Sequence, residues 1–391
     1  MQYKYRILYI QHAQKIGGSV ISLLNLIQNG MENGYECYVL CPNETIANIY
    51  KDYKINAFVS PIIPIDHNTA YYYKLRLKEM LSLLKKIAIS IYNVYKIKKI
   101  LFKIYPDIVH LNSSVLPIYA FFIKKWGFRV VWHIRERISK GYFGIRKNLL
   151  KIAINKFADF AIYIGEEEYR ILNTKKSRSA VIYNYVNIKS FIEYSKAAEK
   201  SKDFIAITLG GISEIKGTHT ILSSLDYLPK EFLIKIIGSE DPMVLSDDVL
   251  DPYYLRIKKI INQLKESSRA KFYSPVIDIK PILYECDVLI FWGLTPHFPR
   301  PIYEAWLFNK PVIVYNNGSL PKEINGNTAL IINEDTPHAL ANGLIAIKYN
   351  YDLFKIKSEI GKSIAIDLFS DNNFHKIDSI YRGILTKINK V

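Results

Sequence analysis

The sequence predicts an α/β protein with two domains, each built around a doubly wound parallel sheet. Short β-branched apolar runs alternate with longer helical patterns along the whole chain, which is typical of parallel sheets covered by helices. The 391 residues exceed what one hydrophobic core usually supports, and a hydrophobic content of 49% is sufficient for two cores. The alternation is interrupted by the polar segment 190–202, which lacks a clear period.

The first domain is expected over residues 1–190. Its first strand is predicted at 6–10, and a helix begins at Gly17, Gly18 and Ser19. The remaining elements follow in alternation: strands at 36–40, 108–111, 129–133, 160–164 and 180–183, a pair of basic helices within 71–105, and helices near residue 120 and over 147–157.

Residues 191–203 are expected to form the linker to a second domain over 204–373. A helix is predicted from Thr218, and strands are predicted at 204–209, 233–237, 270–272, 288–291, 312–315 and 329–331. The segment 374–391 is expected to be a helix that packs back across the domain junction. Doubly wound sheets bind ligands at the carboxyl ends of their strands, so we expect the two domains to face each other across a ligand-binding cleft.

The apolar patterning and the cysteines favour a cytoplasmic protein. No run of about 18 uncharged apolar residues is present, and the N-terminus leads into only a short apolar stretch, so neither a membrane span nor a signal peptide is expected. Cys37, Cys41 and Cys286 are too few and too scattered for a disulfide framework or a zinc site. We expect them to be reduced core thiols.

The net charge of +17 lies entirely in the first half of the chain. Residues 1–190 contain 29 Lys and Arg against 12 Asp and Glu, and the segment 71–105 has nine basic residues with Glu79 as its single acid. Basic amphipathic helices of this kind bind anionic lipid. A solvated helical face is the plain alternative. No nucleic-acid recognition signature accompanies the charge, so we do not expect a nucleic-acid partner.

Three motifs carry residues suited to phosphate and sugar chemistry. Gly17-Gly18-Ser19 opens a helix whose N–H groups would meet a phosphate, although a tight turn needs the same glycines. In the loop 209–217, Lys216 stands just before a helix, where a diphosphate would meet its charge; a surface lysine before a turn is the alternative. Glu304 follows the Pro-rich loop 296–301 and is expected in the first turn of a helix, where a carboxylate would either cap the helix or accept hydrogen bonds from ribose hydroxyls.

Four segments, in this order, resemble the family 4 glycosyltransferases, which are retaining enzymes with the GT-B fold of two Rossmann-like domains. The strand and Gly-Gly-Ser helix at 6–19 resemble the opening of that family, and residues 182–187 (IYNYVN) resemble its I-x-N-G-V-D segment. Residues 214–217 (EIKG) resemble its E-x-K-G turn. Residues 298–313 (FPRPIYEAWLFNKPVI) resemble its F-G-x-P-x-x-E-A-x-x-x-x-K-P-V-I signature. The resemblance extends over nearly the whole chain.

The resemblance implies roles for the matching residues. Lys216 would bind the donor diphosphate, Glu304 the ribose hydroxyls, and the loop with Val276 and Ile277 the base. His133, at a strand end, matches the family's histidine beside the donor sugar, although a lone strand-end histidine is more often structural. The residues expected to be catalytic are His133, Lys216 and Arg300. The full donor-binding set is Gly17, Gly18, Ser19, Gly210, Gly211, Lys216, Val276, Ile277, His297, Phe298, Pro299, Arg300 and Glu304.

The chain departs from the family pattern at three positions. Gly211 replaces a diphosphate-binding Arg, Pro296 replaces the first Glu of a Glu-x7-Glu pair, and Pro299 replaces a Gly whose N–H faces the donor. Arg300 is a candidate for the missing positive charge because its planar guanidinium suits a diphosphate.

The predicted function is transfer of a sugar, with retention, from a nucleotide-diphosphate sugar to a glycan acceptor. By resemblance, the acceptor is lipid-linked and belongs to bacterial surface polysaccharide assembly, on the inner face of the cytoplasmic membrane. The leaving diphosphate would be stabilised by electrostatics. No cofactor is expected, and no Asp-x-Asp motif calls for a metal. A catalytically weak donor-binding subunit and a GT-B sugar-nucleotide epimerase remain alternatives.

Overall fold

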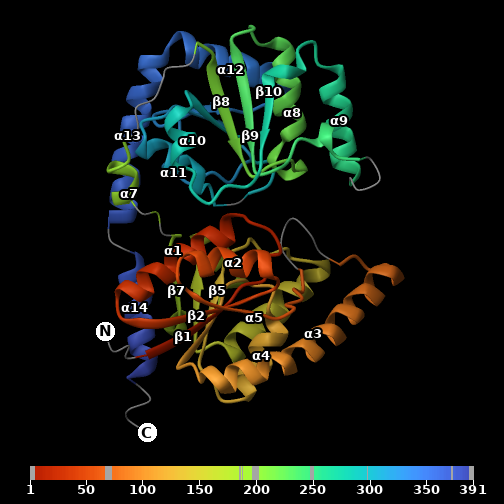
Figure 1. The fold of residues 1–391 in the computed structure, drawn as a ribbon, viewed down its shortest axis with the longest axis vertical. Coiled ribbons are helices and arrows are strands. Elements are labelled where there is room, and N and C mark those ends of the chain that lie inside the picture. The colour runs from red at the N-terminus through yellow and green to blue at the C-terminus, as the bar shows by residue number, and fades with distance from the viewer. Residues whose placement is uncertain are drawn as a thin grey trace. The chain divides into compact units, whose positions relative to one another are not determined.

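The computed structural model describes residues 5–66, 73–184, 186, 188–195, 202–246, 251–296, 298–370 and 373–386. The chain divides into two compact units (Figure 1). Unit 1 comprises residues 1–185 and 372–391, and unit 2 comprises residues 186–371. The chain therefore leaves unit 1, completes unit 2 and returns to unit 1 for its last helix.

Unit 1 contains a seven-stranded parallel sheet in the order β3-β2-β1-β4-β5-β6-β7. The strands are β1 (Tyr5–Ile10), β2 (Tyr35–Cys41), β3 (Asn56–Val59), β4 (Ile108–Leu111), β5 (Val130–Ile134), β6 (Phe160–Tyr163) and β7 (Ser179–Val181). Its helices are α1 (Gly18–Glu32), α2 (Glu44–Asp52), α3 (Leu77–Ile104), α4 (Pro117–Lys125), α5 (Ile145–Phe157), α6 (Glu166–Leu172) and α14 (Asn373–Leu385). Side chains of α3, α4 and α5 share one core cluster with the sheet, and α14 packs beside α1.

Unit 2 contains a six-stranded parallel sheet in the order β10-β9-β8-β11-β12-β13. The strands are β8 (Phe204–Leu209), β9 (Phe232–Ile237), β10 (Ala270–Tyr273), β11 (Val288–Phe291), β12 (Val312–Tyr315) and β13 (Leu330–Ile332). The helices are α7 (Ile188–Ile192), α8 (Thr218–Ser223), α9 (Pro252–Gln263), α10 (Lys280–Glu285), α11 (Arg300–Leu307), α12 (Pro337–Tyr349) and α13 (Tyr351–Ser370). Both units are doubly wound, as the alternation of elements predicts.

The structure differs from the sequence prediction in several elements, including α6, which was not predicted. The expected pair of basic helices is wrong, because the 28 residues of α3 form one continuous helix. α2 and the edge strand β3 were not predicted, although Asn43 caps α2 by accepting a hydrogen bond from the Ile46 N–H. The start of the expected linker is helical, since residues 188–192 form α7, which contacts α11 and α13 of unit 2.

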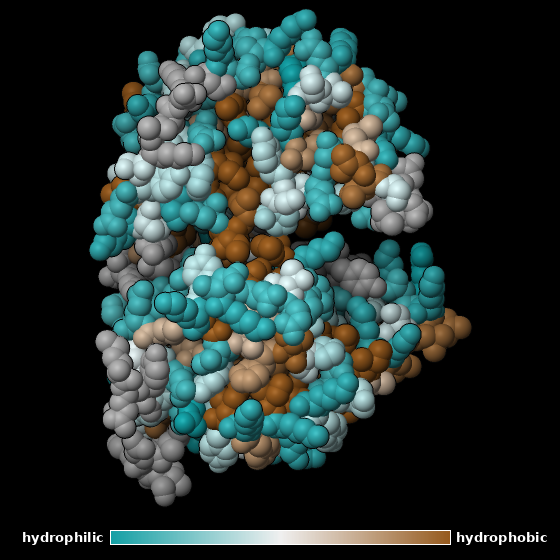
Figure 2. All heavy atoms as spheres, in the orientation of Figure 1, coloured by the Kyte–Doolittle hydropathy of each residue, from teal (hydrophilic) through white to brown (hydrophobic). Residues whose placement is uncertain are grey.

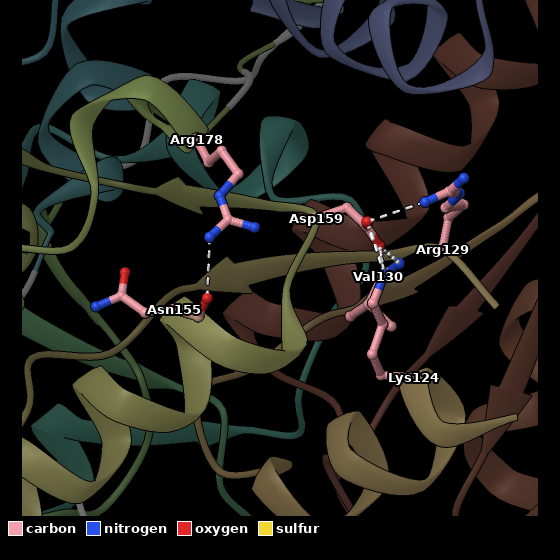
Figure 3. Close-up of polar contacts among 6 residues, drawn as sticks. All are labelled: Lys124, Arg129, Val130, Asn155, Asp159 and Arg178. Carbon is pink, nitrogen blue, oxygen red and sulfur yellow. Dashed lines mark hydrogen bonds and ion pairs between the residues drawn. The ribbon is translucent and has the colours of Figure 1, made fainter. Parts of the chain in front are cut away.

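Three aspartates at the amino ends of strands are hydrogen-bonded to the backbone of the neighbouring strand. The carboxylates of Asp107, Asp159 and Asp287, which precede β4, β6 and β11, accept the backbone N–H of Arg6, Val130 and Ile205 on the neighbouring strands. The aspartate N–H in turn donates to the carbonyl of the same neighbour. The Asp159 carboxylate also forms ion pairs with Lys124 at 2.7 Å and Arg129 at 3.5 Å (Figure 3). A separate hydrogen bond, from Arg178 to the Asn155 carbonyl, is shown in the same figure. These contacts fix the register of the sheets at the end opposite the strand carboxyl ends.

The three cysteines are buried free thiols, as predicted. Burial raises the pKa of each to about 12, so all three are protonated at neutral pH. No helix in the described ranges combines the length and apolar character needed to cross a bilayer.

Candidate functional site

The order of the strands in unit 2 reverses between β8 and β11. β9 and β10 lie on one side of β8, whereas β11, β12 and β13 lie on the other. The loops that leave the carboxyl ends of β8 and β11 therefore diverge, and this switch point is where doubly wound sheets bind ligands. The β8 loop carries Lys216, and the β11 loop leads to Arg300 and Glu304.

Glycines shape the loop after β8. Gly210, Gly211 and Gly217 have φ values of +111°, +68° and +62°, which other residues rarely adopt. A Cβ on Gly211 would lie 2.3 Å from the Ser239 Oγ and 2.5 Å from the Gly238 carbonyl oxygen, so this backbone has no room for an arginine there. The fold by itself thus accounts for these glycines.

Lys216 lies over this loop in a half-buried position. Its side chain runs along Gly210, whose Cβ would meet the Lys216 Cε at 3.1 Å, and its Nζ is 5.7 Å from the centre of the Phe291 ring at the end of β11. Burial lowers the pKa of Lys216 to about 8. A desolvated ammonium group gains more from an anion than a fully hydrated one, because part of its desolvation cost is already met.

The loops after β8 and β11 are joined directly. The Leu294 N–H donates to the Ile215 carbonyl at 2.9 Å. Trp292, which is 2% exposed, packs against Gly217, and its indole N–H donates to Asp335 at 2.7 Å. The loop that carries Lys216 is thereby attached to the segment that follows β11.

Glu304 lies one turn further into α11 than predicted. The helix begins at Arg300, so Glu304 is in its second turn and does not cap the N-terminus. Glu304 is 6% exposed, and its carboxylate accepts a hydrogen bond from the Arg300 Nε at 3.1 Å. Burial raises the pKa of Glu304, whereas Arg300 and Lys280 lower it. Arg300 is therefore engaged with Glu304 in this structure, where the sequence suggested a contact with phosphate.

The remaining predicted residues of unit 2 lie in the loops before α11 and after β10. Phe298 stacks on Tyr303 with ring centres 5.6 Å apart, and Pro299 is the N-cap of α11. Val276 and Ile277 are half-buried in the loop after β10, which is two strands away from β8. His297 lies outside the described residues.

In unit 1, Gly17 and Gly18 at the start of α1 are not required by the local fold. Gly17 has an extended backbone (φ −176°) and Gly18 is helical, and a Cβ on either would meet nothing within 4 Å. A tight turn therefore does not explain them, and the space beside the N-terminus of this 15-residue helix is open. Ser19 is the next residue of α1, and its carbonyl accepts the Asn112 side chain at 3.3 Å. The strand order of this sheet reverses between β1 and β4. The segment that carries Gly17 follows β1 and Asn112 follows β4, so both lie at the carboxyl end of this switch point.

His133 is 3% exposed on β5 and belongs to a buried polar chain. Its Nδ1 is 3.2 Å from the His110 Nε2, and the His110 Nδ1 is 2.6 Å from the Tyr381 hydroxyl on α14. His133 also lines a small pocket together with Arg135, Asn184 and residues of α1 and α14. Burial lowers the pKa of both histidines well below the usual range, and the charge of Arg135 lowers it further.

Comparisons with known proteins agree with this architecture. The family described as Glycosyltransferase Family 4 matches residues 16–190, and the one described as Glycosyl transferases group 1 matches residues 190–362. This chain is a family 4 glycosyltransferase. No curated protein sequence matches it.

Solved structures share the fold of this glycosyltransferase at low sequence identity. HepE from Anabaena, in complex with UDP and glucose, has a TM-score of 0.73 at 16% identity, covering 99% of this chain and 100% of HepE. A sucrose-phosphate synthase from Thermosynechococcus elongatus has a TM-score of 0.71 at 16% identity, covering 98% and 100%. WaaG, a glycosyltransferase involved in lipopolysaccharide biosynthesis, has a TM-score of 0.66 at 13% identity, covering 96% and 100%. The fold is GT-B, with two Rossmann-like units.

Several residues near the predicted site of the glycosyltransferase were not identified from its sequence. Trp292 and Ser239 support the Lys216 loop, and His110 and Tyr381 are bonded into the chain that ends at His133. None belongs to a motif, and Tyr381 is 248 positions away from His133. Ser113 and Ser114, after β4, were not identified either, and their hydroxyls donate to Glu136 beyond the end of β5.

Proposed function

We propose that this glycosyltransferase moves a sugar, with retention, from a nucleotide-diphosphate donor to a glycan acceptor. The observation that carries the proposal is the half-buried Lys216 at the β8/β11 switch point, joined through the Leu294 backbone to the loop that leads to Glu304. A cation with a lowered pKa is suited to a diphosphate, and a buried carboxylate is suited to ribose hydroxyls.

The donor diphosphate is assigned to Lys216 and the ribose to Glu304. As the bond to the sugar breaks, charge grows on the leaving diphosphate, and the ammonium of Lys216 stabilises it. Same-face attack needs no protein nucleophile, so the protein contributes positioning and electrostatics. No metal ion is needed in this proposal.

Complexes of HepE with UDP, with UDP and glucose, and with UDP-glucose support a uridine donor as the first to test. The experiment is a thermal-shift screen of UDP-, GDP-, ADP- and dTDP-sugars, since a ligand that binds the folded state raises its Tm. We expect one nucleotide class to raise the Tm of the native protein and not that of Lys216→Met. Lys322→Met is the matched control, because Lys322 is on a different loop of unit 2. Equal shifts in all three proteins would overturn the assignment of Lys216.

The acceptor is proposed to be lipid-linked, because unit 1 exposes two apolar stripes flanked by basic side chains. On α3, Leu77, Leu81 and Leu84 are 78%, 56% and 59% exposed and lie at i, i+4 and i+7 on one helical face. On α5, Ile145, Leu149 and Ile152 repeat this spacing at 57%, 62% and 60%. Figure 2 shows hydrophobic side chains at the projecting end of α3.

The amino ends of α3 and α5 lie near each other. Arg146 on α5 donates to the Tyr73 carbonyl, just before α3, at 2.9 Å, and both helices contact α4. Phe143, before α5, is 95% exposed. The exposed basic residues around the α3 stripe are Lys74, Arg76, Lys78 and Lys85. Apolar side chains bordered by lysines fit the headgroup region of an anionic membrane, which supports a peripheral location on its cytoplasmic face.

Membrane binding is tested by sedimentation with vesicles of phosphatidylglycerol and phosphatidylcholine. We expect the native protein to sediment with anionic vesicles, and Leu77→Ser/Leu81→Ser/Leu84→Ser to sediment at least roughly tenfold less, since each leucine buries apolar surface. Leu353→Ser/Ile356→Ser on α13 is the control, because these residues are also about half exposed. If the α3 variant binds like the native protein, the proposal fails.

A donor-binding subunit without transferase activity is the second candidate. It is favoured by Pro296 in place of the family's first Glu, and by the lack of room for an arginine at Gly211. A Tm shift with a donor but no transfer or hydrolysis would support it. Formation of an epimer without any acceptor would instead indicate a sugar-nucleotide epimerase.

A further inference from the structure

We propose that Arg300 is a positioning residue for the donor: its guanidinium holds one oxygen of the Glu304 carboxylate, so that the other oxygen is oriented to accept the ribose hydroxyls. The two residues lie about one turn apart on α11, with the Arg300 Nε 3.1 Å from the Glu304 Oε1. The inference rests on the proposed function, in which Glu304 contacts the ribose. It adds the residue that gives this carboxylate its orientation and its charge.

The stability of α11 does not account for an arginine at position 300. Arg300 is the first residue of the helix, where the backbone N–H groups already carry partial positive charge and a further cation is unfavourable. An i, i+4 ion pair with the basic residue first is also the weaker of the two orders on a helix. Pro301, the second residue, suits the first turn by itself. Arg300 therefore opposes the local preferences of the helix, as is expected of a residue that serves a site.

Packing does not account for the ion pair either. The side chains of Arg300 and Glu304 are 14% and 8% exposed, so both charges are largely removed from water. A buried ion pair is often no more stable than apolar residues of the same volume, because desolvation offsets much of the attraction. The rest of this part of α11 is apolar and buried, including Ile302, Ala305 and Trp306. A carboxylate in such surroundings has a role that an apolar side chain cannot take.

The pair suits the recognition of hydroxyl groups. A carboxylate offers two acceptor oxygens, and the contact from the Arg300 Nε engages Oε1, which leaves Oε2 for a ligand. The same contact restricts rotation of the Glu304 side chain, so less conformational entropy is lost when a ligand binds. An ionised carboxylate also forms stronger hydrogen bonds to hydroxyls than a neutral acid does. Arg300 thus prepares Glu304 for the ribose without touching the ribose itself.

Two cations act on the Glu304 carboxylate among the described residues. Burial raises the pKa of Glu304, whereas Arg300 and, to a lesser extent, Lys280 on α10 lower it. The Lys280 ammonium is also paired with Asp278 at 2.9 Å, so it is shared with a second carboxylate. Loss of Arg300 should therefore move the titration of Glu304 to higher pH.

The first measurement needs no ligand. The ¹³Cδ chemical shift of Glu304, assigned from its loss in Glu304→Gln, reports the ionisation of the carboxyl group as the pH is varied. We expect the midpoint to lie at higher pH in Arg300→Met than in the native protein. Arg256→Met, on the exposed side of α9, is the matched control and should titrate like the native protein. A native midpoint in Arg300→Met would contradict the proposal.

The second measurement is calorimetry with two probes. One is the nucleoside diphosphate whose sugar raises the Tm in the thermal-shift screen, and the other is the same diphosphate without ribose hydroxyls, which for UDP is 2′,3′-dideoxy-UDP. The native protein and Arg256→Met should bind the first probe at least about tenfold more tightly than the second. In Arg300→Met and Glu304→Gln this ratio should fall to about twofold. If Arg300 contacted phosphate instead, Arg300→Met would weaken both probes equally and keep the native ratio, and the positioning role would be wrong.

A double variant gives the answer even if Arg300→Met does not fold. Arg300→Met/Glu304→Gln contains no buried carboxylate without its ion pair. A residue that acts only through Glu304 has no effect once position 304 is neutral, so the double variant should bind both probes as Glu304→Gln does. Weaker binding of both probes by the double variant would show that Arg300 contacts the ligand directly, against the proposal.

This proposal and the proposed function fail separately. If no nucleoside diphosphate binds, or if Glu304→Gln keeps the native ratio, the ribose contact of the proposed function is wrong, and the titration of Glu304 still reports the action of Arg300. If Glu304→Gln lowers the ratio but Arg300→Met does not, the ribose contact stands and the positioning role of Arg300 is wrong.

Discussion

At the residue scale, the proposed contact of Lys216 with the donor diphosphate predicts how donor affinity depends on pH. Its folded pKa of about 8 lies below its unfolded value, so the folded state loses this proton first, and stability contributed by Lys216 rises as the pH increases from about 8 towards the unfolded pKa. A bound diphosphate favours the charged form. Donor affinity should therefore be flat near pH 7 and fall by up to about tenfold per pH unit above pH 8.

Isothermal calorimetry of donor binding across this pH range tests the role of Lys216. Lys216→Arg is the control, because a guanidinium stays charged and its affinity should not change between pH 7 and about 9.5. A native affinity that is equally flat would mean that Lys216 does not meet the diphosphate.

Variants of Arg300 and Glu304 distinguish an effect on the stability of unit 2 from an effect on donor affinity. Arg300→Ala should lower donor affinity by roughly 1–3 kcal/mol if Arg300 meets phosphate, and it should also destabilise unit 2 because it leaves a buried carboxylate without this ion pair. Adding Glu304→Gln should restore the Tm without restoring affinity. Unchanged donor affinity of Arg300→Ala in calorimetry would refute a phosphate contact.

The two glycine motifs should respond differently to alanine. Gly18→Ala should leave the Tm within about 1 °C of native and lower turnover, because the new Cβ meets nothing in the protein but lies where a ligand would approach. Gly211→Ala should lower the Tm by several degrees, since its Cβ would overlap Ser239 and Gly238. Native turnover in Gly18→Ala would leave these glycines without a ligand-binding role.

At the scale of elements, the strand-start aspartates set the register of the sheets. Asp159→Ala removes a carboxylate that accepts Lys124, Arg129 and the Val130 N–H, and should cost roughly 2–3 kcal/mol of unfolding free energy. Urea unfolding measures this loss. Asp352→Ala, on the exposed side of α13, is the control and should cost less than about 0.5 kcal/mol.

At the scale of the whole molecule, unit 1 depends on the last helix of the chain. Phe374, Ile377 and Tyr381 of α14 are buried in unit 1, although residues 186–371 intervene in the sequence. Truncation after residue 370 should destabilise unit 1 on the order of 5 kcal/mol and leave unit 2 folded.

Hydrogen exchange followed by mass spectrometry distinguishes the two units. Peptides of β1 and α1 should exchange faster in the truncated protein, and peptides of β8 and β11 should be unaffected. A chain shortened only by residues 387–391 should behave like the native protein. Equal loss of protection in both units would contradict the prediction that α14 stabilises unit 1 alone.

The sequence by itself determined the fold class and the strands that carry the site. β4, β8, β11 and β12 were predicted at their observed bounds, because buried parallel strands are continuous apolar runs with clear ends. The edge strand β3 was missed, since an edge strand is short and partly exposed. The motif residues Lys216 and Glu304 were identified because their loops follow such strands directly.

Only the tertiary structure determined what those residues contact. The pairing of Arg300 with Glu304, the absence of space at Gly211 and the chain from Tyr381 to His133 depend on side chains brought together by packing. Periodicity reports which face of an element is buried, but it carries no information on which distant residue shares that burial. A tyrosine near the end of the chain and a histidine in its first half become neighbours only when α14 returns to unit 1.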